Sequence, residues 1–277
     1  MSMQHLFSGV FDEAWFYLIP LAIEAAGGSS IQGMVDAQRA ILNSDKKAFS
    51  MALKRVADSV ESMIPILKRM YEKNDPHIFW NRVRLYSGGS KNSSTLPNGL
   101  FYEGVTEKDE FVNHNAAIPQ GKVGTWRFYP GASAGQSPLI HSLDIGLDIH
   151  HKAMHSKIEG DSASRQNPML EMRKSLSLQH RAFLTRLGEG PSIREHVSKL
   201  NPSDEAAIEF NRAINALTEF RSTHIQMASL YIVLQQKKSA NAGSDVMNNE
   251  VVVGTGGTDL IPFLKQTRQE TIEAKLT

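Results

Sequence analysis

A histidine in the C-terminal part of the chain is the first residue whose surroundings point to chemistry. His224 lies on the apolar face of a helical repeat that Phe220 and Met227 mark, so its imidazole is expected to face the core. A buried imidazole either makes a structural hydrogen bond or binds a metal. The residue pattern alone favours the structural histidine, and both interpretations stay open at this point.

Three further histidines have the spacing of metal ligands. His151 and His155 lie one helical turn apart, directly after His150. Lys152, however, stands where a metalloprotease carries its glutamate base, and no third ligand can be named. We therefore expect solvated histidines at the end of a helix, where positive charge is favoured, in preference to a zinc site.

An aromatic side chain and an arginine form the next pair. Trp80 and Arg84 are one turn apart on a helix that Asp75 and Pro76 open, close to Phe79. Such a pair suits a small aromatic carboxylate, because the ring stacks and the guanidinium holds the acid. A cation-π pair packed on a helix surface is the alternative, and the residues by themselves favour it.

Glycines cluster in residues 254–259, a composition that also occurs in phosphate-binding loops. The segment lacks the Lys-Ser/Thr ending of a nucleotide loop and follows no convincing strand. It instead predicts a flexible hinge before a helix capped near Thr258 or Asp259. Turn-forming composition over residues 87–98 and 239–257 predicts two mobile segments.

Helices must position all of these residues, and one start signal recurs along the chain. A capping residue or glycine precedes proline at Asp75-Pro76, Ser137-Pro138, Asn167-Pro168, Gly190-Pro191 and Asn201-Pro202. Residues 45–73 form another helical pattern with Pro65 as a kink or break, and Pro20 interrupts the segment 15–24. The only clear β-branched run is 251–253. The sequence predicts an all-α fold in one domain, residues 1–277.

Composition removes several classes of function. Thirty Lys plus Arg face 29 Asp plus Glu, without the basic stripe that nucleic-acid binding needs. The absence of cysteine excludes disulfides, cysteine nucleophiles and thiolate-bound zinc or heme. The longest apolar run, residues 15–23, is shorter than the roughly 20 residues of a membrane span and follows acidic residues. We expect a soluble cytoplasmic protein with neither a span nor a signal peptide.

Taken together, four motifs resemble the indoleamine 2,3-dioxygenases, and the resemblance runs from about residue 6 to residue 277. The motifs are residues 96–104 (LPNGLFYEG), 131–137 (GASAGQS), 220–224 (FRSTH) and 254–260 (GTGGTDL), in the order of the family. The resemblance implies heme b bound between helices. It also implies that dioxygen opens the indole ring of L-tryptophan or a related indoleamine to an N-formylkynurenine-type product.

The resemblance also implies roles for single residues on the proximal side of such a heme. His224 is similar to the axial iron ligand of the family, and Arg221 to an arginine near a heme propionate. Asp144 matches an acidic residue that supports this arginine. A carboxylate in that place makes physical sense, because such outer contacts orient the ligand and tune the iron.

On the distal side, Phe79 and Trp80 match the aromatic pair that contacts the indole, and Arg84 matches the arginine that grips the substrate carboxylate. Ser133, Ala134 and Gly135 fall in a loop beside the distal heme face, where small residues allow close approach. Thr255 matches the threonine of a glycine-rich loop that closes over substrate.

Three departures from the family pattern keep other functions open. The small N-terminal domain of the family has no counterpart before Met1, Pro20 stands where serine is frequent, and Trp80 replaces a phenylalanine. The alternatives are a non-catalytic heme-binding sensor and a heme-dependent oxygenase of another indole. The expected partners are the indole, dioxygen and an electron donor for heme reduction; the sequence does not predict the oligomeric state.

Overall fold

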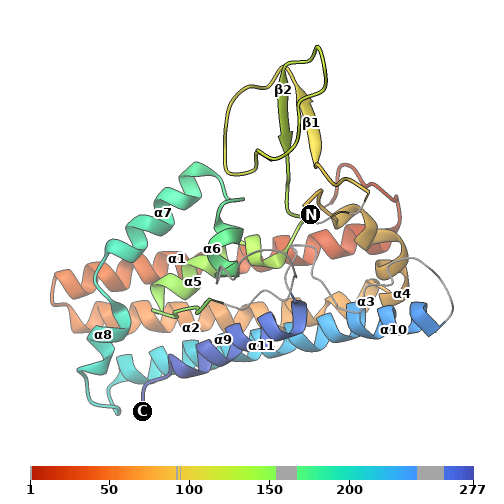
Figure 1. Ribbon diagram of the computed structural model, residues 1–277. Helices are drawn as coiled ribbons and strands as arrows, with labels where there is room; N and C mark the ends of the chain where they lie inside the picture. Colours follow the sequence, from red (N-terminus) through yellow and green to blue (C-terminus); the bar gives the residue numbers. More distant parts are fainter. Residues whose placement is uncertain (1, 92, 94, 154–166, 242–258) are drawn as a thin grey trace.

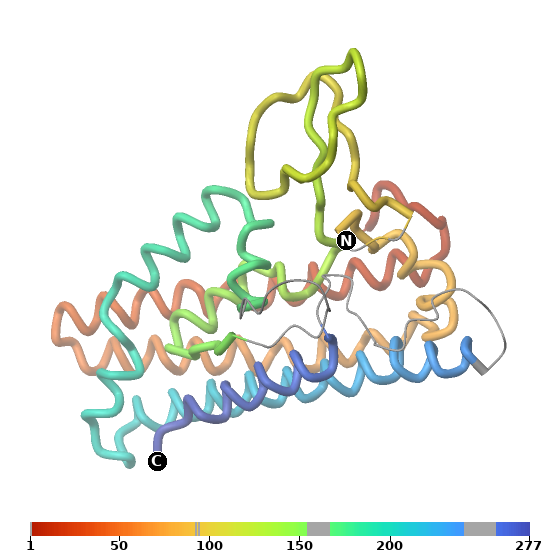
Figure 2. The backbone as a smooth tube through the Cα atoms, viewed as in Figure 1, coloured from red at the N-terminus to blue at the C-terminus, as the bar shows by residue number. Residues whose placement is uncertain are grey.

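Four helices build the body of the protein and lie side by side along its long dimension (Figure 1, Figure 2). The structure is a computed structural model that describes residues 2–91, 93, 95–153, 167–241 and 259–277. Helix α1 packs on α2, α2 on α9, and α9 on α11. The bounds are α1 Phe11–Leu42, α2 Lys46–Lys68, α9 Glu205–Ala228 and α11 Leu260–Glu273.

Shorter helices close the ends and one side of this bundle. They are α3 Met70–Lys73, α4 Pro76–Ile78, α5 Pro138–Gly146, α6 Pro168–Arg173, α7 Leu178–Glu189, α8 Ile193–Ser198 and α10 Leu234–Asn241. Two π-helical turns, η1 Phe79–Val83 and η4 Ser229–Val233, and two 3₁₀ turns, η2 Arg84–Ser87 and η3 Ala134–Gln136, complete the helical elements of the described ranges. The predicted all-α fold is confirmed.

The core is apolar and continuous across the bundle. Most of its fully buried side chains come from α1, α2, α5 and α9, with Met34, Leu53, Leu143 and Phe210 among the largest. Helices α1 and α2 approach closely at Gly33, because a Cβ atom there would stand 2.8 Å from the Val56 side chain. Apolar burial of this kind is the main force that holds the helices together.

Several predicted helix starts are confirmed, and others are wrong. The side chains of Asp75, Ser137 and Asn167 each accept a hydrogen bond from the first turn of a helix that begins with proline. Asn201 instead closes a turn with Ser203, and α9 begins after Asp204, whose carboxylate caps Ala206. Helix α8 likewise begins after Ser192 and not at Pro191. The helix predicted near Thr258 or Asp259 is present, because α11 follows Asp259.

Neither interior proline breaks its helix. Pro20 lies inside α1 and Pro65 inside α2, and both helices continue through them. A proline removes one backbone hydrogen bond, and the packing of α1 on α2 outweighs this local loss. The predicted interruption at Pro20 is therefore wrong, as is a break at Pro65.

A small hairpin, which the residue pattern did not predict, projects from the bundle (Figure 1). Strands β1 Leu100–Glu103 and β2 Gly124–Arg127 pair antiparallel, with Phe101 opposite Trp126. Their rings lie 5.3 Å apart, a cross-strand pair that stabilises the two strands. The run 251–253 lies outside the described residues. Within the described chain, no helix is long and apolar enough to cross a membrane.

Candidate functional site

His224 is a half-buried residue near the C-terminal end of α9. Among the described residues, the His224 imidazole has no hydrogen-bond partner. These residues therefore do not support the interpretation of His224 as a hydrogen-bonded structural histidine. Burial lowers the pKa of His224, and the positive charge of Arg221 lowers this pKa further. The ring is therefore neutral at physiological pH and presents a nitrogen lone pair, as a metal ligand requires.

Arg221, one turn before His224, joins three helices. Its guanidinium donates to Asp144 Oδ1 on α5 at 2.6 Å and to the backbone oxygen of Thr267 on α11 at 2.9 Å. It also donates to the hydroxyl of Thr271 on α11. Arg221 is 8% exposed and Asp144 only 1%, so the ion pair is buried. The structure brings together the arginine and the carboxylate that the family resemblance paired.

His151 extends this ion pair into a cluster. Its Nε2 lies 2.9 Å from Asp144 Oδ2, and its Nδ1 lies 2.6 Å from Glu270 Oε2 on α11. The second oxygen of Glu270 accepts the backbone N–H of Lys152 at 2.9 Å. Burial opposes ionisation of Asp144, yet Arg221 and His151 hold the pKa of this carboxyl below its usual value. We call Asp144, His151, Arg221 and Glu270 the charged cluster.

The expectation for the neighbouring histidines is thus wrong in one respect. His150 is exposed, as expected, but the side chain of His151 is only 5% exposed and binds two carboxylates. His155 lies outside the described residues. The partner Glu270 follows 119 positions later, so local spacing does not reveal it. Polar residues three and four apart on one face, Thr267, Glu270 and Thr271, were the available sequence signal.

A second group of side chains near the candidate site is aromatic and is centred on Phe79. Phe79 contacts Phe16 of α1, with ring centroids 4.8 Å apart, and Tyr231 of η4, with centroids 5.6 Å apart. The Tyr231 hydroxyl donates to the backbone oxygen of Asn74 at 2.5 Å. We call Phe16, Phe79 and Tyr231 the aromatic cluster. Phe16 and Tyr231 were not singled out from the sequence.

Tyr231 of the aromatic cluster and His224 lie on one continuous helical segment, formed by α9 and η4. Tyr231 follows His224 by seven residues, which corresponds to about 10 Å along the helix axis. The two π-helical turns meet here, since Phe79 begins η1 and Tyr231 is in the middle of η4. Such turns are rare and occur frequently at functional sites.

Trp80 and Arg84 form the pair that their spacing predicted. The Arg84 guanidinium carbon lies 4.9 Å from the Trp80 ring centroid, and the indole N–H donates to Ser239 Oγ on α10 at 3.0 Å. The cation-π contact is present, although both side chains are buried and not on a helix surface. Burial lowers the pKa of Arg84.

The small-residue loop next to α5 is held by its own hydrogen bonds. Ser133 caps η3, and Gln136 returns a bond to the Ser133 backbone, so Ala134 and Gly135 are fixed between them. A Cβ atom on Gly135 would come within 2.1 Å of the Met172 sulfur, so any other residue would require the Met172 side chain of α6 to move. Thr255 lies outside the described residues.

A second buried histidine lies beside this loop. His141 of α5 is fully buried, and its Nδ1 accepts a hydrogen bond of 3.3 Å from Arg173 Nε on α6. Burial, reinforced by the charge of Arg173, lowers the pKa of His141 to about 4. His141 is therefore neutral in the folded protein and is a further residue that the sequence did not single out.

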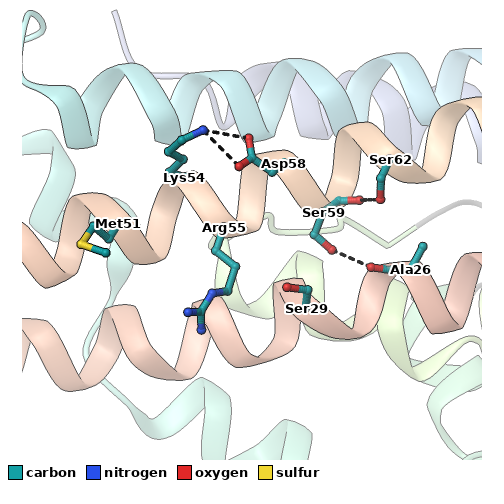
Figure 3. Close-up of a pocket in the computed structure, with 8 residues that line it drawn as sticks. All are labelled: Ala26, Ser29, Met51, Lys54, Arg55, Asp58, Ser59 and Ser62. Carbon is teal, nitrogen blue, oxygen red and sulfur yellow. Dashed lines mark hydrogen bonds and ion pairs between the residues drawn. The ribbon is translucent and has the colours of Figure 1, made fainter.

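Two hollows of the described surface do not include His224 in their lining. A groove between α1 and α2 is lined by Ala26, Ser29, Met51, Lys54, Arg55, Asp58, Ser59 and Ser62 (Figure 3). Several of its polar groups are already engaged, since Lys54 pairs with Asp58 and the Ser59 hydroxyl donates to the Ala26 backbone oxygen. The second, smaller hollow borders His151 and Glu270. We place the candidate site at His224 and not in either hollow.

The chemistry of the available donors fits a heme iron, which takes one protein nitrogen on its proximal side. His224 offers a neutral imidazole, whereas the described residues contain no group of three or more His, Cys, Asp or Glu side chains arranged to hold a bare metal ion. Fold and site thus describe a mainly helical protein in which the neutral imidazole of His224 is the candidate ligand for an iron cofactor.

The chain belongs to the indoleamine 2,3-dioxygenase family, which it matches over residues 1–274. Enzymes of this family depend on heme iron. An indoleamine 2,3-dioxygenase of Aspergillus candidus is 35% identical over 96% of the chain and 60% of its own length. Indoleamine 2,3-dioxygenase 1 of Rattus norvegicus is 32% identical over 100% of the chain and 62% of its own length. The chain thus spans about three-fifths of the length of these relatives.

Proposed function

We propose that the chain binds heme b through His224 and is a dioxygenase that acts on L-tryptophan or a related indoleamine. The observation that carries the proposal is the family match over residues 1–274, within which His224 stands in the FRSTH motif. The product would be of the N-formylkynurenine type: the C2–C3 bond of the indole breaks, and each of these carbons receives one oxygen atom of dioxygen. Residues 1–277 would act as one heme-binding domain.

The bound heme supplies the activation of dioxygen, while the chain supplies placement and polarity. His224 would hold the iron with its neutral imidazole. Arg221 and Asp144 would orient the end of α9 and set the charge beside the cofactor, with Arg221 directed to a heme propionate. An electron donor is expected to keep the iron reduced.

On the substrate side, the ring of Phe79 would pack against the indole, with Phe16 and Tyr231 behind it. Arg84 would hold the substrate carboxylate, and Trp80 would limit the width of the pocket. Ser133, Ala134 and Gly135 would line the cofactor, where their small size would let the loop backbone come close to it. The role of Thr255 as part of a closing loop remains a prediction from the resemblance.

The test is to load the purified chain with heme, reduce it, and supply air and L-tryptophan. Absorbance and mass spectrometry should detect N-formylkynurenine, with the heme-free chain as the control. Heme binding without conversion of tryptophan would favour the sensor alternative. A differently oxidised indole would favour the other oxygenase, for which the replacement by Trp80 is the motivating feature.

A further inference from the structure

His151 stands between two carboxylates in a place that its position in the sequence does not suggest. One ring nitrogen faces Asp144 of α5 at 2.9 Å, and the other faces Glu270 of α11 at 2.6 Å. The side chains of His151, Asp144 and Glu270 are 5%, 1% and 4% exposed. Water therefore has little access to either contact.

The number of donors determines the charge of this ring. A carboxylate only accepts hydrogen bonds, and a neutral imidazole carries a single N–H group. Two carboxylates can be satisfied at once only if both ring nitrogens carry protons. Glu270 is itself held as an acceptor, because its other oxygen receives the Lys152 backbone N–H at 2.9 Å and the Gln266 amide at 2.8 Å. With both carboxyl groups ionised, this geometry requires an imidazolium.

Charge balance leads to the same result. The charged cluster contains two carboxylates, Asp144 and Glu270, and one permanent cation, Arg221. A protonated His151 brings the buried charge to zero, and unpaired buried charges are strongly disfavoured. The other charged or titratable groups nearby are His141 of α5, Arg173 of α6 and Lys152, whose ammonium reaches Glu273 at 3.6 Å.

The cluster forms a chain of contacts that ends one turn before His224. Glu270 binds His151, His151 binds Asp144, and Asp144 binds Arg221. The backbone of His151 is fixed as well, since its carbonyl oxygen accepts the Asn167 amide at 2.7 Å. A displacement of His151 would therefore move the carboxylate that orients Arg221.

We propose that His151 is a positioning residue: its imidazolium bridges Asp144 and Glu270, fixes α11 against α5, and thereby holds Arg221 and the end of α9 that carries His224. The proposal rests on the proposed function only for the effect on the heme. The cationic bridge itself belongs to the chain without cofactor and is tested separately.

The first test uses the heme-free chain. In ¹⁵N-labelled protein, NMR should show protons on both ring nitrogens of His151 at pH 7. Burial opposes this charge, but the bonds to Asp144 and Glu270 raise the pKa of His151 above its ordinary value. A raised folded pKa stabilises the folded state below the unfolded pKa of about 6.5, and this stability is lost as pH rises through the folded value.

Urea unfolding of the wild type should therefore show a loss of stability on the alkaline side, which His151→Gln removes. The matched control is His150→Gln, which changes the exposed neighbour and should retain the wild-type pH profile. Glu270→Gln provides a second variant, and in it the bridge should lose one proton at pH 7. A ring with a single proton at pH 7 in the wild type would overturn the cationic bridge.

The second test uses the heme-loaded chain. Loss of an outer partner of a metal ligand typically lowers affinity about tenfold to a hundredfold. Because His151 acts on His224 through Asp144 and Arg221, His151→Gln should weaken heme binding by about the lower end of this range and shift the iron–histidine stretching band in resonance Raman spectra, whereas His150→Gln should change neither. Unchanged affinity and an unchanged band in folded His151→Gln would refute the positioning role.

The two proposals fail in distinguishable ways. If the wild type binds no heme, the proposed function fails together with the effect of His151 on the cofactor, and the NMR result still decides the bridge. If the wild type binds heme and forms product while His151→Gln matches it in affinity, band and pH profile, only the inference about His151 fails.

Discussion

Arg221 of the charged cluster lies one helical turn before His224 and Tyr231 of the aromatic cluster about two turns after it, yet the two clusters are held by different forces. Arg221 and His151 join Asp144 through directional contacts of 2.6 and 2.9 Å. Phe79 meets Phe16 and Tyr231 through ring faces and edges. Charged hydrogen bonds fix one arrangement and tolerate little change, whereas ring packing allows adjustment. The charged cluster is therefore expected to be the rigid side of the candidate site and the aromatic cluster the adaptable side.

The largest effect is expected at the residue between the two clusters. His224→Ala removes the only proposed protein ligand of the iron, so heme binding should be lost. Titration of the purified chain with hemin, followed by absorbance, measures it. His180→Ala serves as the control, because His180 is exposed on α7. A reduced His224→Ala chain with the wild-type heme spectrum would contradict the assignment.

Breaking the charged cluster should cost the next largest amount. Asp144→Ala leaves Arg221 and His151 buried without their shared partner, and the loss of one member of a buried pair costs about 3 to 5 kcal/mol. Urea unfolding measures this loss. Asp58→Ala is matched in chemistry, since Asp58 also pairs with an arginine at 2.6 Å, but its side chain is 51% exposed. The control should lose about 0 to 1 kcal/mol. Equal losses of stability in Asp144→Ala and Asp58→Ala would contradict the difference expected between a buried and an exposed ion pair.

Lowering the pH should reduce the stability of the folded protein through His141, which lies beside the small-residue loop. The folded pKa of about 4 lies below the unfolded value, so His141 contributes stability above pH 6.5 that is lost as pH falls toward 4. The full difference is about 3 kcal/mol, since one pKa unit corresponds to about 1.4 kcal/mol. His141→Gln should flatten the unfolding free energy between pH 6.5 and 4 relative to the wild type. His180→Gln should keep the slope. The contribution of His151 to the unfolding free energy has the opposite pH dependence and changes above pH 6.5.

Arg84 tests the substrate side. If it grips a carboxylate, Arg84→Ala removes a charge-assisted hydrogen bond of about 1.5 to 3 kcal/mol. The apparent KM for tryptophan should then rise about tenfold to a hundredfold. Steady-state kinetics measures it, with the exposed Arg82→Ala as the control. A wild-type KM in Arg84→Ala would rule out the carboxylate role.

The smallest effect is expected within the aromatic cluster. Tyr231→Phe keeps the ring against Phe79 and removes only the hydroxyl that donates to the Asn74 oxygen, so the loss should be about 1 kcal/mol. Urea unfolding measures it, and Tyr71→Phe, at a more exposed tyrosine, should change the stability by less than about 0.5 kcal/mol. A loss in Tyr231→Phe as large as in Asp144→Ala would mean that hydrogen bonds, and not ring packing, hold this side.

Much of the framework was predictable because its signals are local. Asp75, Ser137 and Asn167 cap helices that proline begins, and these residues act within one turn of their own position. The apolar repeat around His224 predicted a helix there, and α9 covers it. The resemblance named Asp144 and Arg221, which lie in contact.

The remaining features depend on contacts between distant parts of the chain. His151 was expected in solvent. Its partner Glu270 lies on α11, far along the chain, so the residues around His151 did not reveal the contact. Phe16 meets Phe79 only after α1 packs beside η1. The hairpin joins β1 and β2 across a long connection, and its strands are too short for a clear alternating pattern. Local spacing carries no information about any of these pairings.

The π-helical turn η4 joins α9 to α10. It determines in which direction about the helix axis the side chains of α10 point relative to those of α9. A wider turn holds one more residue than an α-helical turn, and one residue corresponds to a rotation of about 100° about the axis. Its extra residue therefore sets the direction in which Ser239 emerges relative to His224, and Ser239 receives the indole N–H of Trp80. Shortening this turn by one residue would leave His224 in place while it turned Ser239 away. Chain length at this point, and not only residue type, thus couples the two sides of the site.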